Sequence, residues 1–451
     1  MKKNDEIELY IDGYTSEGSG VGHYNGMAVF VSGAAAGDTV TVHIIKVKKT
    51  YAVGIIKNII TPCAARIEPD CPVCTRCGGC CYRHITYESE LELKRRKVDD
   101  AFSRIAGLDI KAQEIIPSPQ VNSYRNKAML PVGKDAQGNT VLGFYSQKSH
   151  RIIPTDACLL HGEIFREISE IFTDFADRHS LSVYDEESGK GLLRHLYIRY
   201  AEKTVQVMVC PVINGNDLPH KNELAGEIAA RYPTASILYN INKEKTNVVL
   251  GEKCVSIYGQ PYIEDILCGV RVRISPLSFY QVNRSQAENL YKKAAEYAAL
   301  TKDDVLLDLY CGAGTIGLSM ADKVKTVIGA EIVPQAIENA KANAGLNGIT
   351  NARFICADAA QAAKQLREEG IKPDVIIVDP PRKGCDNELI ETVTGMAPSK
   401  IVYVSCDPAT LARDAAIFDR LGYKATRLCA ADMFPRTSHV ETVVLMSRTM
   451  E

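Results

Sequence analysis

The last third of the chain alternates short continuous apolar runs with longer segments in which apolar residues recur at helical spacing. This alternation of buried strands and helices predicts a doubly wound, mostly parallel sheet within residues 263–451, in which a helix at Gln281–Ala299 leads to the first strand. Such sheets bind ligands at the carboxyl ends of their strands, where we therefore expect the functional residues. The expected strands are Val305–Tyr310, Val324–Glu331, Ala352–Cys356, Asp374–Asp379, Lys400–Ser405, Tyr423–Cys429 and His439–Met446.

Residues 1–60 follow another pattern, in which short alternating runs are separated by glycines. This pattern predicts a small closed β-barrel. One run, Thr39–Val47, ends among three lysines and Tyr51, a combination that suits RNA contact but is equally expected of a solvated strand end. Residues 61–262 mix helices and strands, with a helix expected over residues 86–106, and the pattern sets no strand order there. We expect an α+β fold for this central part.

Composition changes this picture only slightly. The 451 residues carry 53 Lys+Arg and 55 Asp+Glu, a net charge of −2, which argues weakly against a strongly cationic nucleic-acid binder. A local positive face can still exist, and we expect it at Lys46–Lys49, Arg95–Lys97 or Arg125–Lys127. The sequence shows no signal-peptide pattern and no apolar run near the ~20 residues of a membrane span, so we expect a cytoplasmic protein without membrane contact.

Cysteines form the first feature that needs a chemical cause. There are 15, and five of them fall within residues 71–81. Because cytosolic thiols stay reduced, metal binding explains this clustering better than disulfides do. Four thiolates in one loop suit either a [4Fe–4S] cluster or a tetrahedral zinc ion, and spacing does not choose between them. The four recur at every third position: Cys71, Cys74, Cys77 and Cys80.

A glycine-rich turn follows the first strand of the predicted sheet, in the segment Asp308–Gly317. Its glycines allow a ligand to approach the backbone closely. Glu331, 19 residues after Gly312, ends the next strand, where a carboxylate can accept hydrogen bonds from ribose hydroxyls. The glycine spacing, Gly312-x-Gly314-x-x-Gly317, also fits a dinucleotide-binding fingerprint. This loop alone therefore does not distinguish a nicotinamide-dependent enzyme from a methyltransferase with a nucleoside cofactor.

Two further loops at the same rim favour nucleobase methylation. One begins Asp379-Pro-Pro-Arg382, and the other places Cys406 between a strand and a helix. A thiolate that adds to C6 of uracil activates C5, and a base must afterwards remove the C5 proton. We expect Cys406, with its pKa lowered by the helix N-terminus, to be the nucleophile, and Glu441 to be the base. A buried rim cysteine and a surface carboxylate are the plain alternatives, and Asp379 is expected to orient the base or to shape the turn.

Together these segments resemble the RNA uracil-5-methyltransferases that modify 23S ribosomal RNA or tRNA. DLYCGAGT, DPPRKG, VSCDP and HVETV are similar to four signatures of that family, and GSGVGHYNGMAVFVSGAAAGDTVTV resembles its TRAM domain. The resemblance implies a TRAM barrel over 1–60, a central iron–sulfur domain over 61–262 and a Rossmann-like class I methyltransferase domain over 263–451. It also implies residue roles: S-adenosylmethionine contacts at Gln281, Tyr310, Glu331 and Asp379, catalysis by Cys406 and Glu441, and a [4Fe–4S] cluster on Cys71, Cys77, Cys80 and Cys158, with Cys74 as the competing fourth ligand.

The resemblance implies methylation of C5 of a uridine in 23S rRNA, with that RNA as partner and no obligate protein partner. The tRNA branch of the family typically lacks the cluster and the TRAM domain, which favours rRNA. A tRNA uracil-5-methyltransferase, a cytosine-5 methyltransferase, an oxidoreductase and a non-catalytic RNA-binding ribosome-assembly factor are the alternatives.

Overall fold

The computed structural model of the chain describes residues 1–147, 149–155 and 158–449. These residues form two compact units, each made from separate stretches of the sequence. The first unit contains Met1–Lys97, Phe144–Ile153 and Phe434–His439. The second contains the described parts of Val98–Gly143, Pro154–Met433 and Val440–Glu451. No helix in the described ranges has the length and apolarity needed to cross a membrane.

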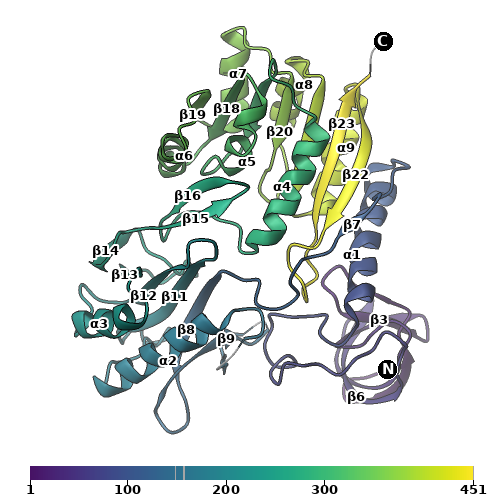
Figure 1. Cartoon of the computed structure of the whole chain (residues 1–451). Coiled ribbons are helices and arrows are strands. Elements are labelled where there is room, and N and C mark those ends of the chain that lie inside the picture. Colours follow the sequence, from purple (N-terminus) through teal and green to yellow (C-terminus); the bar gives the residue numbers. More distant parts are fainter. Residues whose placement is uncertain (148, 156–157, 450–451) are drawn as a thin grey trace. The chain divides into compact units, whose positions relative to one another are not determined.

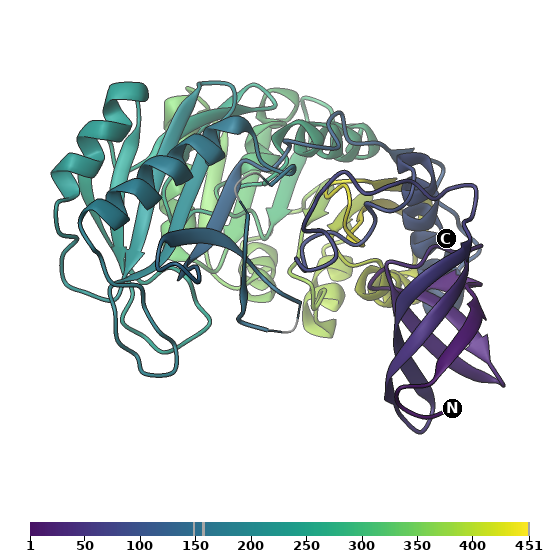
Figure 2. The same cartoon turned by 90° about the horizontal axis from the view of Figure 1, so that it is seen from below.

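The N-terminal residues form the expected barrel, seen in purple in Figure 2. Its sheet has the order β1-β5-β6-β4-β3-β2, and the apolar side of each strand fills one interior core. The two edge strands, β1 and β2, are consecutive in the chain, so one edge of the sheet leads directly into the other, and the N–H of Asp12 between them donates to the carbonyl of Val21 on β3. The strands are β1 Glu6–Tyr10, β2 Gly13–Tyr14, β3 Gly20–Tyr24, β4 Met27–Ser32, β5 Thr39–Val47 and β6 Tyr51–Thr61.

A fully buried carboxylate, that of Asp38, ties the barrel to the segment that follows it. It accepts the N–H of Ala35 at 2.7 Å and that of Cys63 at 2.9 Å, and it pairs with the guanidinium of Arg66. Burial alone raises the pKa of Asp38, but these donors reverse the effect and hold it below its ordinary value. The start of the cysteine segment is thereby fixed against the barrel.

The helix expected over residues 86–106 is present but changes type before its end. α1 spans Tyr87–Ala101 and continues as a π-helix, η1, over Phe102–Ala106. Within the first unit, buried Glu90 accepts from Lys94 and from the backbone N–H of Arg436, both at 2.7 Å. The basic residues of this helix therefore serve partly as internal ion pairs, since Arg95 also pairs with Glu92.

The second unit begins with a mixed sheet in the order β9-β8-β11-β12-β13-β14, flanked by two helices. The paired strands expected near residues 192–210 are its central antiparallel pair, β11 and β12. A two-stranded hairpin, β15 and β16, follows and leads toward the last sheet. The bounds are β7 Ile115–Ile116, β8 Lys127–Lys134, β9 Thr140–Tyr145, β10 Ile152–Pro154, α2 Glu163–Arg178, β11 Leu193–Ala201, β12 Gln206–Ile213, α3 Lys221–Arg231, β13 Ser236–Ile241, β14 Lys253–Tyr258, β15 Ile263–Leu267 and β16 Val270–Ile274.

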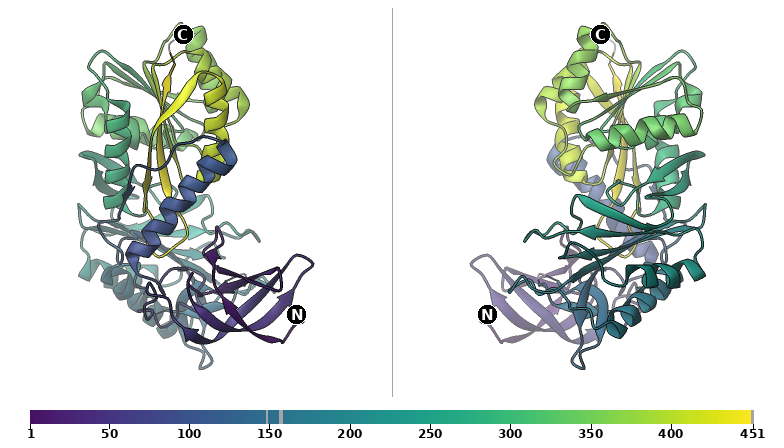
Figure 3. Two further views of the ribbon diagram at one scale, coloured as in Figure 1. Left: turned by 90° about the vertical axis from the view of Figure 1, so that its right-hand side faces the viewer. Right: turned by 90° about the vertical axis from the view of Figure 1, so that its left-hand side faces the viewer.

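The C-terminal sheet is doubly wound, as the sequence pattern predicts. Its order is β19-β18-β17-β20-β21-β23-β22-β7, parallel from β19 to β21, with β23 antiparallel to both of its neighbours. Helices α7, α8 and α9 pack on one face, and α4 packs against β21, β22 and β23 on the other (Figures 1 and 3). The bounds are α4 Arg284–Ala298, β17 Val305–Leu309, α5 Thr315–Leu318, the 3-10 helix η2 Ala321–Lys323, β18 Thr326–Glu331, α6 Pro334–Leu346, β19 Ala352–Cys356, α7 Ala359–Glu368, β20 Val375–Val378, α8 Asn387–Gly395, β21 Lys400–Ser405, α9 Pro408–Arg420, β22 Tyr423–Ala431 and β23 Glu441–Arg448.

Candidate active site

The glycine-rich loop after β17 turns sharply at the carboxyl end of the sheet. Tyr310 has a φ of 65° and Gly314 a φ of 79°, so the loop depends on left-handed backbone that glycine adopts freely and tyrosine only under strain. A Cβ on Gly317 would lie 2.9 Å from Oδ2 of Asp308, whose carboxylate accepts the N–H of Gly317. The helix expected after the loop is a single turn, α5.

A pocket at this loop brings together three of the four residues expected to contact S-adenosylmethionine. Gln281, Tyr310 and Asp379 line it, and Glu331 is joined to its wall because Gly312 donates its backbone N–H to that carboxylate at 3.2 Å. The rest of the wall consists mainly of aromatic side chains and of residues of the glycine-rich loop. Its remaining lining residues are Leu267, Phe279, Tyr280, Tyr291, Cys311, Gly312, Ala313, Thr315 and Ile316.

Carboxylates dominate the electrostatics of this pocket. Burial, with smaller contributions from Asp379 and Glu331, raises the pKa of Asp308 to about 7, and the hydrogen bond from Gly317 opposes this shift. Oδ1 of Asp308 is buried without a hydrogen-bond partner among the described residues. Asp379 lines the pocket and Glu331 is bonded to its wall, so the site offers negative charge to a ligand such as S-adenosylmethionine, which carries a sulfonium and an ammonium group.

Cys406 lies where the sequence predicts it, between β21 and α9. Asp407 caps α9 by accepting the N–H groups of Ala409 and Thr410, so the thiol precedes a well-formed helix N-terminus. The expectation of a lowered pKa is nevertheless wrong. Burial raises the pKa of Cys406 to about 11, with further contributions from Glu441 and Asp379, and these outweigh the opposing effect of Arg382.

Glu441 is a buried group, not a surface carboxylate. β23 lies between β21 and β22, and Glu441 is 6% exposed. Ser405 pairs with Thr442 across the two antiparallel strands. Cys406, which follows Ser405, and Glu441, which precedes Thr442, are therefore brought to the same edge of the sheet. Burial raises the pKa of Glu441 to about 8, with a further increase from Asp379 and a decrease from Arg382.

Arg382 is a candidate functional residue that the sequence motifs did not single out. It hydrogen-bonds the sulfur of Cys406 and favours the ionised forms of both Cys406 and Glu441. Its loop is braced from α9, because Oδ2 of buried Asp414 accepts the N–H of Cys385 at 2.8 Å. Its place in the segment DPPRKG, directly after the predicted strand and Asp379, was the available signal.

The cysteine segment belongs to the first unit, where its four regularly spaced thiols influence one another. Burial raises the pKa of Cys80; Arg83 opposes this, and Cys77 and Cys71 raise it further. Cys71 likewise adds to the effect of burial on Cys74 and on Cys77. Free thiols are the ligands that an iron–sulfur cluster or zinc prefers, but among the described residues the structure does not bring the sulfurs of this segment within 4.8 Å of one another as a group of three.

Cys81 and Cys158 lie outside this regularly spaced set of four thiols. Burial raises the pKa of Cys81, with Lys94 and Glu90 as the next influences, and its sulfur lies against Gly18. Cys158 belongs to the second unit, and residues 156–157, part of the segment IPTDACLL in which it was identified, lie outside the described residues.

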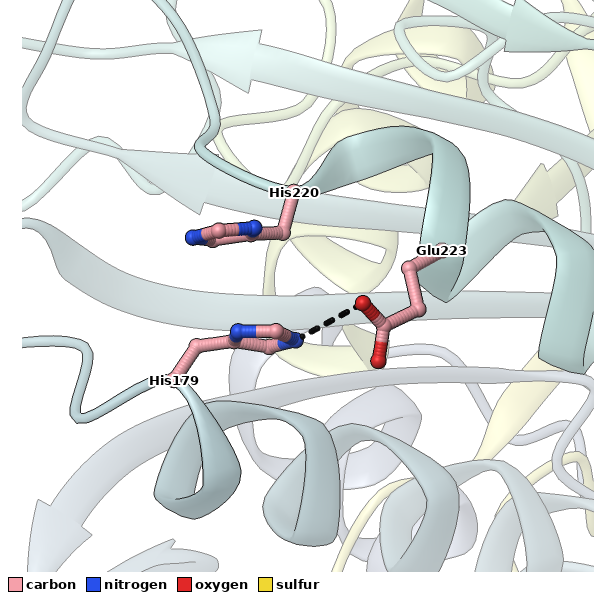
Figure 4. Close-up of side chains that lie close together, drawn as sticks. All are labelled: His179, His220 and Glu223. Atoms are coloured by element: carbon pink, nitrogen blue, oxygen red, sulfur yellow. Dashed lines mark ion pairs between the residues drawn. The ribbon is translucent and has the colours of Figure 1, made fainter.

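A second group with metal-ligand side chains lies at the ends of α2 and α3. His179, His220 and Glu223 lie within 4.8 Å of one another through their ligand atoms (Figure 4). The two imidazole rings are stacked at 3.9 Å with an interplanar angle of 12°, so their nitrogen lone pairs lie in parallel planes and do not converge on one point. Glu223 is also shared with Arg178. This geometry describes a stacked histidine pair with a carboxylate better than a metal centre.

The barrel offers the exposed basic residues expected of an RNA-binding surface. Lys46, Lys48 and Lys49 are exposed at the end of β5 and directly after it. Tyr51 packs against Phe30 at 5.3 Å. Positive charge beside aromatic rings is typical of barrels that bind single-stranded RNA.

Comparison with known proteins agrees with this geometry. The sequence model of the family described as tRNA (Uracil-5-)-methyltransferase matches residues 269–449, and that of the TRAM domain matches residues 2–57. An uncharacterized RNA methyltransferase of Clostridium tetani is 46% identical, covering 99% of this chain and 97% of the relative. One of Bacillus cereus is 41% identical, covering 99% and 98%.

A solved structure is similar over nearly the whole length. The tRNA (uracil-54, C5)-methyltransferase of Pyrococcus abyssi, in complex with S-adenosyl-L-homocysteine, has a TM-score of 0.80 and 30% identity, covering 98% of this chain and 99% of the other. The full-length relatives, both family models and the acidic pocket at the glycine-rich loop, below called the donor pocket, all indicate the same family. The chain belongs to the RNA uracil-5-methyltransferase family, with an N-terminal TRAM domain and a class I methyltransferase fold that uses S-adenosylmethionine.

Proposed function

We propose that this protein methylates C5 of a uridine in 23S rRNA through a covalent bond between Cys406 and C6 of the base. The observation that carries the proposal is the convergence of a thiol, two carboxylates of raised pKa and a guanidinium beside the donor pocket. In this scheme residues 1–60 bind RNA, residues 61–262 hold an iron–sulfur cluster and residues 263–451 carry out methyl transfer. Gln281, Tyr310, Glu331 and Asp379 hold the methyl donor.

The first step is activation of the thiol. Asp379 and Glu441 have pKa values of about 7 and 8, so near neutral pH both are partly protonated and repel a thiolate less than full charges would. The hydrogen bond from Arg382 then favours loss of the Cys406 proton to solvent. The thiolate forms the S–C6 bond, and the electron pair of the C5–C6 double bond moves toward O4, which makes C5 nucleophilic.

Bound S-adenosylmethionine would supply the methyl group: the electron pair moves back from O4 to form the C5–CH3 bond, the S–CH3 bond breaks, and S-adenosylhomocysteine leaves. Glu441, in its carboxylate form, then removes the C5 proton, and the electron pair left at C5 restores the double bond and expels the Cys406 thiolate. Glu441 later releases the proton to solvent, so atoms and charges balance over the cycle. We assign to Asp379, which lines the pocket, the further role of accepting the N3–H of the base.

The cysteine segment supports the second part of the proposal. We propose a [4Fe–4S] cluster on Cys71, Cys77 and Cys80, with Cys158 as the fourth ligand and Cys74 as its competitor. A bound cluster would supply a rigid cross-link in a segment that otherwise consists mainly of turns.

A tRNA uridine is the second candidate substrate. The Pyrococcus abyssi enzyme is named for tRNA and matches this chain almost end to end, so the presence of an N-terminal barrel does not by itself favour rRNA. The cysteine segment is the remaining argument for rRNA, and it comes from the family resemblance. The substrate therefore has to be assigned by experiment.

Mass mapping of RNA from a strain that lacks the protein tests the substrate. We expect one fragment of 23S rRNA to be lighter than in wild-type cells by about 14 Da, the mass difference between a methyl group and the hydrogen that it replaces. Purified wild-type protein should restore the methyl group in vitro with S-adenosylmethionine. Loss of 5-methyluridine from tRNA alone would assign the tRNA activity instead.

Replacing Cys406 by Ala tests the nucleophile. Methyl transfer should fall to background, because no thiolate can activate C5, while the affinity for S-adenosylmethionine measured by calorimetry stays within about twofold. Cys254→Ala, a half-buried thiol on β14, is the matched control and should retain activity. Turnover by Cys406→Ala would exclude the covalent mechanism, and cellular function without turnover would favour the non-catalytic assembly factor.

Replacing Glu441 by Gln tests the base. Addition and methyl transfer should proceed but elimination should stall, which gives a protein–RNA adduct visible as a shifted band on a denaturing gel. Elimination from the adduct needs the base ionised but no further loss of the Cys406 proton, so the rate at which the wild-type adduct breaks down in a single turnover should rise about tenfold per pH unit below the pKa of about 8 and level off above it. A flat profile between pH 6 and 8, or no adduct, would place the base elsewhere.

Metal analysis tests the cluster. Anaerobically purified protein should be brown, with about four irons per chain. Cys77→Ala should lose the iron, Cys81→Ala should keep it because its sulfur lies against Gly18 and Lys94, and comparing Cys74→Ala with Cys158→Ala identifies the fourth ligand. A colourless protein with one zinc would replace the cluster proposal.

A further inference from the structure

A buried carboxylate, that of Asp414, lies on α9, the helix that begins two residues after Cys406. Its Oδ2 accepts the hydroxyl of Tyr403 at 2.7 Å and the backbone N–H of Cys385 at 2.8 Å. Its Oδ1 accepts Nε–H of Arg413 at 2.8 Å. A buried carboxylate destabilises a fold unless it is paired and hydrogen-bonded, and these donors meet that condition.

The contacts of this carboxylate converge on one loop, residues 379–386, between β20 and α8. A terminal nitrogen of Arg413 donates to the carbonyl of Lys383 at 2.8 Å, so the pair of Arg413 and Asp414 holds the loop through both a carbonyl and an N–H. Gly384 has a φ of 78°, and a Cβ there would lie 2.4 Å from Oδ2 of Asp414. Only a glycine at this position lets the loop approach α9 so closely.

The same loop carries the guanidinium of Arg382. Gly384 donates its N–H to the carbonyl of Pro381 at 2.8 Å, which closes a four-residue turn with Arg382 as its second residue. From this turn Arg382 hydrogen-bonds the sulfur of Cys406. The contacts that α9 makes with residues 383–385 therefore hold the turn from which Arg382 reaches the thiol.

The charge of Arg382 matters because acidic groups surround the thiol. In addition to burial, Glu441 on β23 and Asp379 after β20 raise the pKa of Cys406, and Arg382 opposes them. A guanidinium that moves away opposes them less, because the interaction between charges weakens with distance. The fraction of Cys406 present as thiolate thus depends on how firmly the turn is held.

We propose that Asp414 is a positioning residue for the thiol, acting through Arg382. Together with Arg413 it holds the loop against α9, and the loop holds the guanidinium at Cys406. The inference rests on the proposed function for the role of the thiol in methyl transfer, but the contacts themselves do not depend on the substrate. Neither Asp414 nor Arg413 belongs to the sequence motifs described above.

The test follows alkylation of Cys406 by iodoacetamide in the full-length protein between pH 8 and 11.5. Mass spectrometry of the peptide that contains Cys406 separates this thiol from the other cysteines. Only the thiolate reacts, so the wild-type rate should rise with pH and bend toward a plateau near the pKa of about 11.

Replacing Asp414 by Asn keeps the size of the side chain but removes its charge. One of the two oxygens becomes an NH2 group, which then meets either the N–H of Cys385 or the guanidinium of Arg413. The bend in the profile should move up by about one pH unit. At pH 8–9 the rate should fall about fourfold, because a tenfold lower thiolate fraction is partly offset by the greater nucleophilicity of a more basic thiolate.

Two further variants separate positioning from a general effect on the fold. In an Arg382→Gln background, Asp414→Asn should change the rate by no more than about 1.5-fold, because the guanidinium through which it acts is gone. Arg413→Gln loosens the same loop from a side chain that is 48% exposed, so it leaves the interior intact. It should lower the rate about twofold, since a partly exposed contact contributes less than a buried one.

Asp419→Asn is the matched control, because Asp419 lies on the same helix but pairs with Lys424 of β22 at 2.7 Å. Its profile should equal that of the wild type, and circular dichroism shows whether each variant is folded. A wild-type profile in folded Asp414→Asn, or in Arg413→Gln if Asp414→Asn does not fold, would overturn the proposal. An equal loss with and without Arg382 would also overturn it. The expected profiles without methyl transfer to any RNA would overturn only the proposed function.

Discussion

The register between β21 and β23 is the constraint on which the candidate active site depends. Because Ser405 faces Thr442, the thiol of Cys406 and the carboxylate of Glu441 reach one edge of the sheet from segments 35 residues apart in the sequence. A slip of one residue would turn Glu441 to the opposite face and move every apolar side chain of β23 out of its layer. The apolar packing of the strand interior thereby enforces the chemistry at its end.

Burial shifts the pKa values of the acidic groups at this edge of the sheet and of the thiol beside them. Glu441, Asp379 and Asp308 are carboxyls whose pKa values are raised toward neutrality, and they share a site with a thiol whose pKa they raise in turn. Such groups titrate as a coupled set, so a change in the charge of one alters the others. Arg382 is the cation that opposes the acids, and a positively charged donor would act in the same direction.

Sequence patterns predict those parts of the structure that depend on local periodicity and on short motifs. The alternation after residue 300, the glycine loop and the placement of Cys406 and Glu441 at strand ends all follow from such patterns. The order of the central sheet does not, because pairings such as Lys127 with Arg199 join strands about 70 residues apart. The pKa direction of Cys406 also eluded prediction, since the helix N-terminus is visible in the sequence but the carboxylates around the thiol are not.

The composition of the first unit has a consequence for the order in which the chain folds. Its barrel and α1 come from the first 97 residues, but the N–H donated to buried Glu90 belongs to Arg436, whose carbonyl also accepts from Cys81 and Tyr82. A ribosome synthesises the intervening 330 or so residues before Arg436 exists. The first unit is therefore synthesised first but gains its last segment, Phe434–His439, only near the end of synthesis. That segment ends two residues before Glu441, the first residue of β23. The last part of the first unit and the final strand of the second unit thus leave the ribosome together.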